Sequence, residues 1–177
     1  ATKAQFLRSL THLTAFAGRI RLPDPAAVVS DLHADVVPEL ISLDIFITLC
    51  YARIDLGRKL LEFVDCGHTE IIHYQPAKGS CERLKGENLP LGFVAEETYR
   101  LVTRPLKEGD ILFFYSDGVT ECHRPDGEMY GVDRLVEIIE KYSADKPEQL
   151  IDRVTKDLIS FSGHDTFDDD VTCVAIK

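Results

Sequence analysis

Two short acidic segments, far apart in the sequence, hold the residues best suited to chemistry. Residues 111–115 are all large and apolar, which predicts a strand buried on both faces, and Asp117 follows this strand almost directly. Residues 171–176 form a second apolar segment, and Asp169 and Asp170 stand directly before it. A carboxylate at the rim of a core needs a partner, because an ionised, unpaired group there is costly.

An antiparallel arrangement would bring these two segments together. The end of one strand then lies beside the beginning of its neighbour, so the acids would converge on one rim. Clustered carboxylates repel one another, and a site made of hard oxygen ligands is what Mg²⁺ or Mn²⁺ prefers. The alternatives are an ordinary Asp-Gly turn at residues 117–118 and a solvated acidic loop, which we favour for Asp165 and Asp168.

Several motifs resemble those of one known family. Residues 110–121 and 125–131 are similar to the signature of bacterial protein serine phosphatases of the stage II sporulation protein E group, which are type 2C-like, metal-dependent enzymes. Three further segments agree in order: Asp65-Cys-Gly-His-Thr69, Leu89-Pro-Leu-Gly92 and Asp169-Asp-Val-Thr172. Together the motifs span roughly residues 45–177.

The resemblance implies a mechanism and a set of site residues. A water bridging two Mn²⁺ or Mg²⁺ ions would hydrolyse a phosphoserine or phosphothreonine ester, because such a water ionises readily and the ions neutralise phosphoryl charge. Asp117 and Asp169 match the metal ligands, which makes them the expected catalytic residues. Gly118 would let the backbone turn tightly beside the ion. We expect the Asp170 side chain to cap a backbone N–H or to hydrogen-bond in the outer shell of the metal site. We expect His68 to be a structural hydrogen-bonding residue rather than a general acid.

The chain also departs from the family pattern. Such domains begin with two strands bearing Gly-Asp-x-x-Asp and Asp-Val-x-Gly-His-Gly motifs, and neither motif occurs here. Residues 1–10 resemble the helix that follows the second motif. We therefore interpret residues 1–177 as a single phosphatase-like domain, truncated at its N-terminus. Two divalent ions need more carboxylates than remain, so this fragment is expected to have an incomplete metal site.

The spacing of apolar residues predicts helices at both ends of the chain and strands between them. Helices are expected over residues 3–17, 25–40, 132–139 and 150–159. Strands are expected over residues 45–54, 60–64, 70–74, 81–84, 98–103, 111–115 and 171–176. This grouping favours an α+β fold with antiparallel sheets packed face to face. The family resemblance implies an α-β-β-α sandwich of two mostly antiparallel sheets flanked by helices, here without its N-terminal strands.

Composition excludes several other classes of protein. The chain has 177 residues, of which 45% are hydrophobic, enough for one substantial core. Its net charge of −10 argues against a nucleic-acid partner. Its five cysteines are odd in number and lack Cys-x-x-Cys spacing, so neither a disulfide framework nor a zinc site is indicated. No apolar run is long enough to span a membrane and no signal-peptide pattern is present, so we expect a cytoplasmic domain.

By analogy with the family that the motifs resemble, the expected partner is a small phosphorylated bacterial regulator, such as an anti-sigma-factor antagonist with an STAS fold. An upstream sensor domain is compatible with this role. Two other functions remain open. A haloacid-dehalogenase-type phosphatase would need a nucleophilic aspartate where this chain has Tyr115. A non-catalytic interaction domain would have kept the sandwich fold and lost metal binding, and the absent leading strands favour it.

Overall fold

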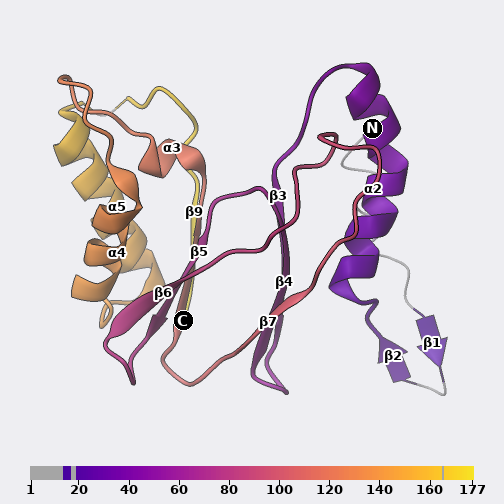
Figure 1. Ribbon diagram of the computed structural model, residues 1–177. Helices are drawn as coiled ribbons and strands as arrows, with labels where there is room; N and C mark the ends of the chain where they lie inside the picture. The colour runs from indigo at the N-terminus through magenta and orange to yellow at the C-terminus, as the bar shows by residue number, and fades with distance from the viewer. Residues whose placement is uncertain (1–13, 17–18, 165) are drawn as a thin grey trace. The chain divides into compact units, whose positions relative to one another are not determined.

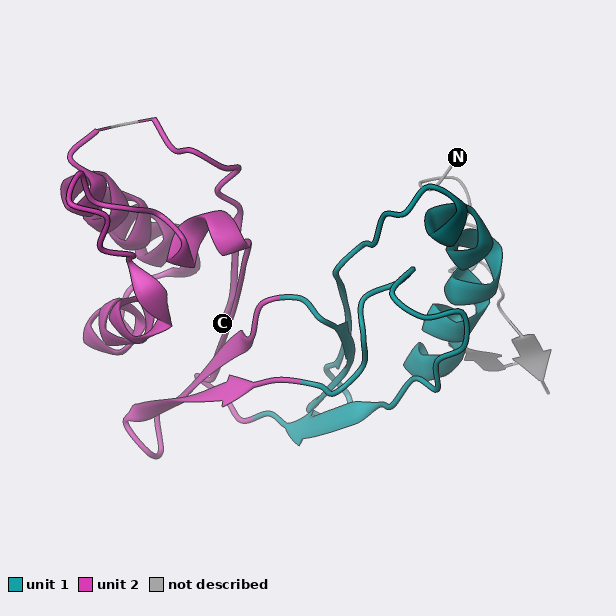
Figure 2. Ribbon diagram, turned by 45° about the horizontal axis from the view of Figure 1, so that its top comes forward, with its two compact units in different colours: residues 1–68, 86–106 teal, residues 69–85, 107–177 magenta. Residues whose placement is uncertain are grey.

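The computed structural model describes residues 14–16, 19–164 and 166–177. The chain forms two compact units, which Figure 2 shows in different colours. The first unit comprises residues 1–68 and 86–106, and the second comprises residues 69–85 and 107–177. Among the described residues, no helix combines the length and the apolar character that a bilayer crossing requires.

The first unit contains a helix on a three-stranded antiparallel sheet. The sheet order is β3-β4-β7, with β3 Leu49–Asp55, β4 Leu60–Cys66 and β7 Val102–Pro105. Helix α2, Pro25–Ser42, packs against β3 and β4 (Figure 1), where its apolar stripe meets Val64 and Leu91. A separate antiparallel pair joins β1, Thr14–Phe16, to β2, Arg19–Arg21.

The beginning of α2 follows from its sequence. Asp24 is the N-cap, and its Oδ1 accepts a hydrogen bond from the Ala26 N–H at 2.8 Å. Pro25 occupies the first helical position, where its missing N–H costs nothing. This cap and the apolar stripe that follows it confirm the second predicted helix.

The second unit contains a four-stranded antiparallel sheet with helices packed on it. The sheet order is β6-β5-β8-β9, with β5 Ile71–Gln75, β6 Ser80–Leu84, β8 Ile111–Tyr115 and β9 Cys173–Ile176. Helix α4, Gly131–Lys141, contacts β5 and β6, and helix α5, Pro147–Ser162, contacts β9 (Figure 1). A single helical turn, α3, covers Asp117–Thr120. Phe113 from β8 and Val154 from α5 are both fully buried in the core of this unit.

The predicted α+β class with two antiparallel sheets and flanking helices is confirmed, while several elements differ from their predicted bounds; the strand predicted over 171–176, for example, begins at Cys173. Residues 14–16 form strand β1 and pair with Arg19–Arg21, so the helix predicted over residues 3–17 is wrong for residues 14–16. Residues 3–13 and 17 lie outside the described residues. The strand predicted from Ile45 begins at Leu49, because Ile47 instead exchanges two 2.9 Å backbone bonds with Leu91. The strand predicted over 98–103 lies at Val102–Pro105, where it pairs with β4.

A buried polar pair closes one end of β8. His73, which is fully buried, donates from Nε2 to Asp110 Oδ2 at 2.8 Å, and the same carboxylate oxygen accepts the Lys107 N–H at 2.9 Å. Gln75 completes the arrangement by donating from its side-chain amide to His73 Nδ1 at 3.2 Å. His73 is therefore a buried residue with both ring nitrogens satisfied.

Replacing Asp110 by alanine should destabilise the chain by about 1–3 kcal/mol, because the buried His73 N–H and the Lys107 amide both lose their acceptor. Urea denaturation followed by circular dichroism measures this loss. The matched control is Asp152→Ala, which removes an exposed carboxylate from α5 and should change stability by less than about 0.5 kcal/mol. Equal stability of the two variants would contradict a structural role for the pair.

Candidate active site at the end of strands β8 and β9

The pairing of β8 with β9 places the two acidic segments beside each other. Tyr115, the last residue of β8, is in register with Cys173, the first residue of β9. One residue further, the Ser116 N–H donates to the Thr172 carbonyl at 3.0 Å. The predicted antiparallel pairing is thus confirmed, and it joins the chain just before Asp117 to the chain just after Asp170.

Asp117 begins the short helix α3 at the point where β8 ends. Its carboxylate is exposed, and Oδ1 accepts the Gly118 N–H at 3.1 Å. Its carbonyl oxygen accepts the Glu121 N–H at 2.8 Å, which closes the helical turn. The Asp-Gly pair, for which an ordinary turn was the alternative, is therefore the first residue pair of a helix, and the strand places an exposed carboxylate at the rim of the core.

Gly118 lies where another segment passes close to its backbone, rather than at a turn that needs a special torsion. The positive-φ glycines of the structure do not include Gly118, so its backbone needs no special torsion. A Cβ atom added at this position would instead lie 2.7 Å from the Asp170 carbonyl oxygen and 3.3 Å from that of Asp169. The absence of a side chain lets the α3 backbone touch the segment that precedes β9.

The acids before β9 differ in their surroundings. Asp169 is exposed, and its Oδ1 accepts the Asp170 N–H at 2.7 Å. Asp170 is exposed too, and its carbonyl oxygen accepts the Ser116 hydroxyl at 2.7 Å. Asp168 is exposed, as a solvated loop residue should be, whereas Asp165 lies outside the described residues. The structure thus brings Asp117–Gly118 against Asp169–Asp170, while metal ligation by these side chains stays a prediction.

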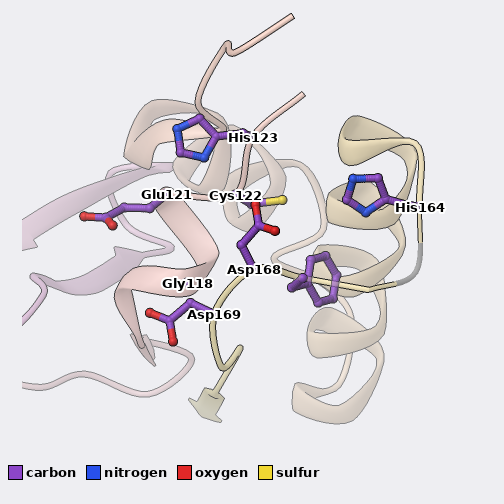
Figure 3. A pocket seen from close by; sticks show the side chains of 8 residues that line it. Gly118, Glu121, Cys122, His123, His164, Asp168 and Asp169 are labelled. Carbon is purple, nitrogen blue, oxygen red and sulfur yellow. The ribbon is translucent and has the colours of Figure 1, made fainter. Parts of the chain in front are cut away.

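A pocket of about 170 Å³ opens beside Asp169 and Gly118. Its lining, shown in Figure 3, is Gly118, Glu121, Cys122, His123, His164, Phe167, Asp168 and Asp169. Figure 3 shows Asp168 beside Cys122, whereas the part of Asp169 that lies close to Gly118 is its backbone carbonyl. Burial and then the charge of Asp168 raise the pKa of the Cys122 thiol, so it is a poor thiolate nucleophile. The remaining groups of this pocket suited to chemistry are its carboxylates and the imidazoles of His123 and His164.

His68 has structural contacts in the first unit. Its backbone N–H donates to Asp65 Oδ1 at 2.9 Å, and the other oxygen of the same carboxylate accepts the Gly86 N–H at 2.9 Å. Its ring Nδ1 lies 3.5 Å from the Thr48 hydroxyl. Asp65 therefore holds two loops together, and these contacts agree with the expected structural role of His68. Sequence reasoning quoted Asp65 within a motif but gave it no role, although an Asp shortly before a Gly is a common turn signal.

The donor set limits which metal the residues can hold. Within the described parts of the chain, no group of three or more His, Cys, Asp or Glu side chains is arranged to bind a metal ion. Asp117 and Asp169 contribute hard carboxylate oxygens, which suit Mg²⁺ or Mn²⁺ better than zinc. These two carboxylates would supply only part of the oxygen ligands that a divalent ion requires.

Known proteins share this chain's sequence pattern. The phosphoserine phosphatase RsbU of Bacillus subtilis is 26% identical over 146 residues, which cover 81% of this chain and 43% of RsbU. Protein IcfG of Synechocystis is 28% identical over 131 residues, which cover 74% of this chain and 20% of IcfG. The chain therefore spans less than half the length of either relative.

Solved structures share its fold. The SiaA-PP2C domain of Pseudomonas aeruginosa matches with a TM-score of 0.81 at 18% identity, over 99% of this chain and 67% of that one. A Bacillus subtilis SpoIIE structure, containing the PP2C phosphatase domain and a fragment of the regulatory domain, matches with a TM-score of 0.74 at 21% identity, over 98% of this chain and 47% of that one. The family described as stage II sporulation protein E (SpoIIE) matches residues 4–177. Because this match covers nearly the whole sequence, the chain belongs to the stage II sporulation protein E family.

Proposed function

We propose that this chain is part of a metal-dependent protein phosphatase that hydrolyses a phosphoserine or phosphothreonine of a bacterial regulatory protein. The observation that carries the proposal is the β8–β9 pairing, which sets the Asp117–Gly118 backbone against that of Asp169–Asp170. The name of RsbU, a phosphoserine phosphatase, supports the reaction class. An anti-sigma-factor antagonist with an STAS fold is the partner we propose, with the reaction in the cytoplasm and an upstream sensor domain in control.

The proposed chemistry assigns a role to each acid. Asp117 and Asp169 would hold a divalent ion through exposed carboxylate oxygens, and Asp170 would act in the outer shell. Mn²⁺ or Mg²⁺ bound there, two ions in a complete domain, would supply an acidic water and neutralise phosphoryl charge. Without a cation, Asp117, Asp169 and the overall charge of −10 would repel a phosphorylated substrate. Substrate binding and metal binding should therefore depend on each other.

The direct test is phosphate release from a phosphorylated STAS-type regulator with Mn²⁺, with Mg²⁺ and with a chelator. We expect the full-length protein to release phosphate only when a divalent ion is present. The 177-residue chain should show weak or no turnover, because two carboxylates make a partial site. Turnover that persists in excess chelator would refute the metal-dependent mechanism, and rapid metal-stimulated turnover by the 177-residue chain would refute the partial site.

One observation favours a second candidate, a non-catalytic interaction domain. In the described ranges, no three potential ligand side chains gather around a common point. Such a domain would bind its phosphorylated partner without hydrolysing it and without a response to Mn²⁺. The same assay distinguishes the two functions, because full-length protein that binds but never releases phosphate would support the second one.

A further inference from the structure

The Ser116 hydroxyl connects the two acidic segments. Its Oγ–H donates to the Asp170 carbonyl at 2.7 Å, and its Oγ accepts the Thr172 N–H at 2.9 Å. A hydroxyl can donate one hydrogen bond and accept others at once, and here both capacities are used on one neighbouring segment. Ser116 thus touches the backbone on both sides of Val171.

These contacts change how the β8–β9 ladder ends. A regular hydrogen-bonded pair exchanges two backbone bonds. At Ser116 and Thr172 the first of these is present, from the Ser116 N–H to the Thr172 carbonyl at 3.0 Å. The Thr172 N–H donates to the serine side chain instead of continuing the ladder. The segment before β9 is therefore held by a side chain at the point where it leaves the sheet and lies against Gly118.

The end of β8 is held from its other side as well. The Thr69 hydroxyl donates to the carbonyl oxygen of Tyr115, the residue immediately before Ser116. Thr69 stands just before β5, which is the other neighbour of β8 in the sheet. The peptide that leads into Asp117 is thus fixed between the segments flanking β8, and Ser116 supplies the contact to the segment that carries Asp169.

We propose that Ser116 is a positioning residue, whose hydroxyl fixes the Asp169–Asp170 backbone relative to Asp117 before any metal binds. This inference rests on the proposed function, because it assigns the two aspartates to one metal site. The serine itself lies next to Asp117 in sequence and acts through the backbone of the other segment. Alanine at this position would leave the Thr172 amide and the Asp170 carbonyl without their partner.

The test uses the full-length protein with Ser116→Ala, Ser116→Thr and a matched control, Ser42→Ala. Ser42 also donates its hydroxyl to a backbone carbonyl, that of Glu39 at 2.8 Å, but it belongs to α2 in the first unit. Hydrogen–deuterium exchange of peptides from residues 167–177 reports on the segment, and paramagnetic resonance of free Mn²⁺ reports metal affinity. Neither readout depends on turnover.

In Ser116→Ala we expect exchange in this segment to rise about 3- to 10-fold, the factor for the one hydrogen bond that the Thr172 amide loses. Mn²⁺ affinity should fall about 10-fold, which is the smaller end of the roughly 10- to 100-fold loss that follows when a residue orienting a metal ligand is replaced. Ser116→Thr and Ser42→Ala should stay within about 3-fold of the wild type in both measurements, threonine because it restores the hydroxyl.

Two results would overturn the inference, and they are distinguishable. If the wild type binds Mn²⁺ and Asp117→Asn does not, while Ser116→Ala matches the wild type, the positioning role fails and the proposed function stands. If the wild type binds no Mn²⁺, the proposed function fails and the positioning role fails with it, whatever the exchange data show.

Discussion

Replacing Asp117 by asparagine should reduce metal-dependent phosphate release by the full-length protein more than about 100-fold. Loss of a group that only orients a metal ligand costs about 10- to 100-fold, and loss of a direct ligand should cost more. Asparagine keeps the shape of the side chain and can still accept the Gly118 N–H, so the α3 turn should form as before. The measurement is steady-state phosphate release at saturating Mn²⁺, with circular dichroism to verify folding.

The matched control is Asp126→Asn. Asp126 is also an exposed aspartate followed by glycine in the second unit, and its Oδ1 accepts the Glu128 N–H at 3.1 Å. It lies outside the pocket lining, so its substitution should leave turnover within about 3-fold of the wild type. Equal losses in the two variants would show that Asp117 acts through local structure, and unchanged turnover in Asp117→Asn would remove it from the metal site.

The helices and strands predicted best are those whose bounds follow from the pattern of apolar residues within the element itself. The apolar run of β8 gave the bounds Ile111–Tyr115 directly, because a strand buried on both faces needs no polar alternation. Helices α4 and α5 followed from apolar residues at helical spacing. Strand β7 was misplaced because its bounds depend on the register with β4, where Pro105 faces Leu60. Local propensity does not contain that information.

In the candidate site, too, some features follow from local sequence and others depend on contacts between distant segments. The convergence of the segments at Asp117 and Asp169 was predictable, because it needs only two strand ends and antiparallel pairing. The part played by Ser116 was not, since a serine before an acid is an ordinary turn residue until its partners across the sheet are known. Gly118 was singled out for a tight turn, but its torsion is ordinary, and the close approach of Asp170 to its backbone leaves no mark in local sequence.

Gly118 therefore carries the second large prediction, that Gly118→Ala weakens Mn²⁺ binding and slows turnover about 10- to 100-fold. The added methyl carbon would lie 2.7 Å from the Asp170 carbonyl oxygen, closer than real side chains approach backbone atoms. The backbone of the segment before β9 must then move by several tenths of an ångström. This movement carries Asp169 away from Asp117. A misplacement of about 1 Å costs roughly 100-fold in rate, so a shift of several tenths of an ångström should cost at least about 10-fold. The same overpacking should destabilise the chain by about 1–3 kcal/mol.

The comparison that isolates this close approach is Gly57→Ala in the full-length protein. A Cβ at Gly57 meets only Asp55 Oδ1, at an ordinary 3.4 Å, and Gly57 is not among the positive-φ residues. Both variants thus add one methyl group at a glycine without unusual torsion, and only Gly118→Ala forces two backbone segments apart. Mn²⁺ titration and urea denaturation of the pair separate loss of the metal site from loss of stability. Wild-type Mn²⁺ affinity in Gly118→Ala would mean that the spacing of these two segments does not determine metal binding.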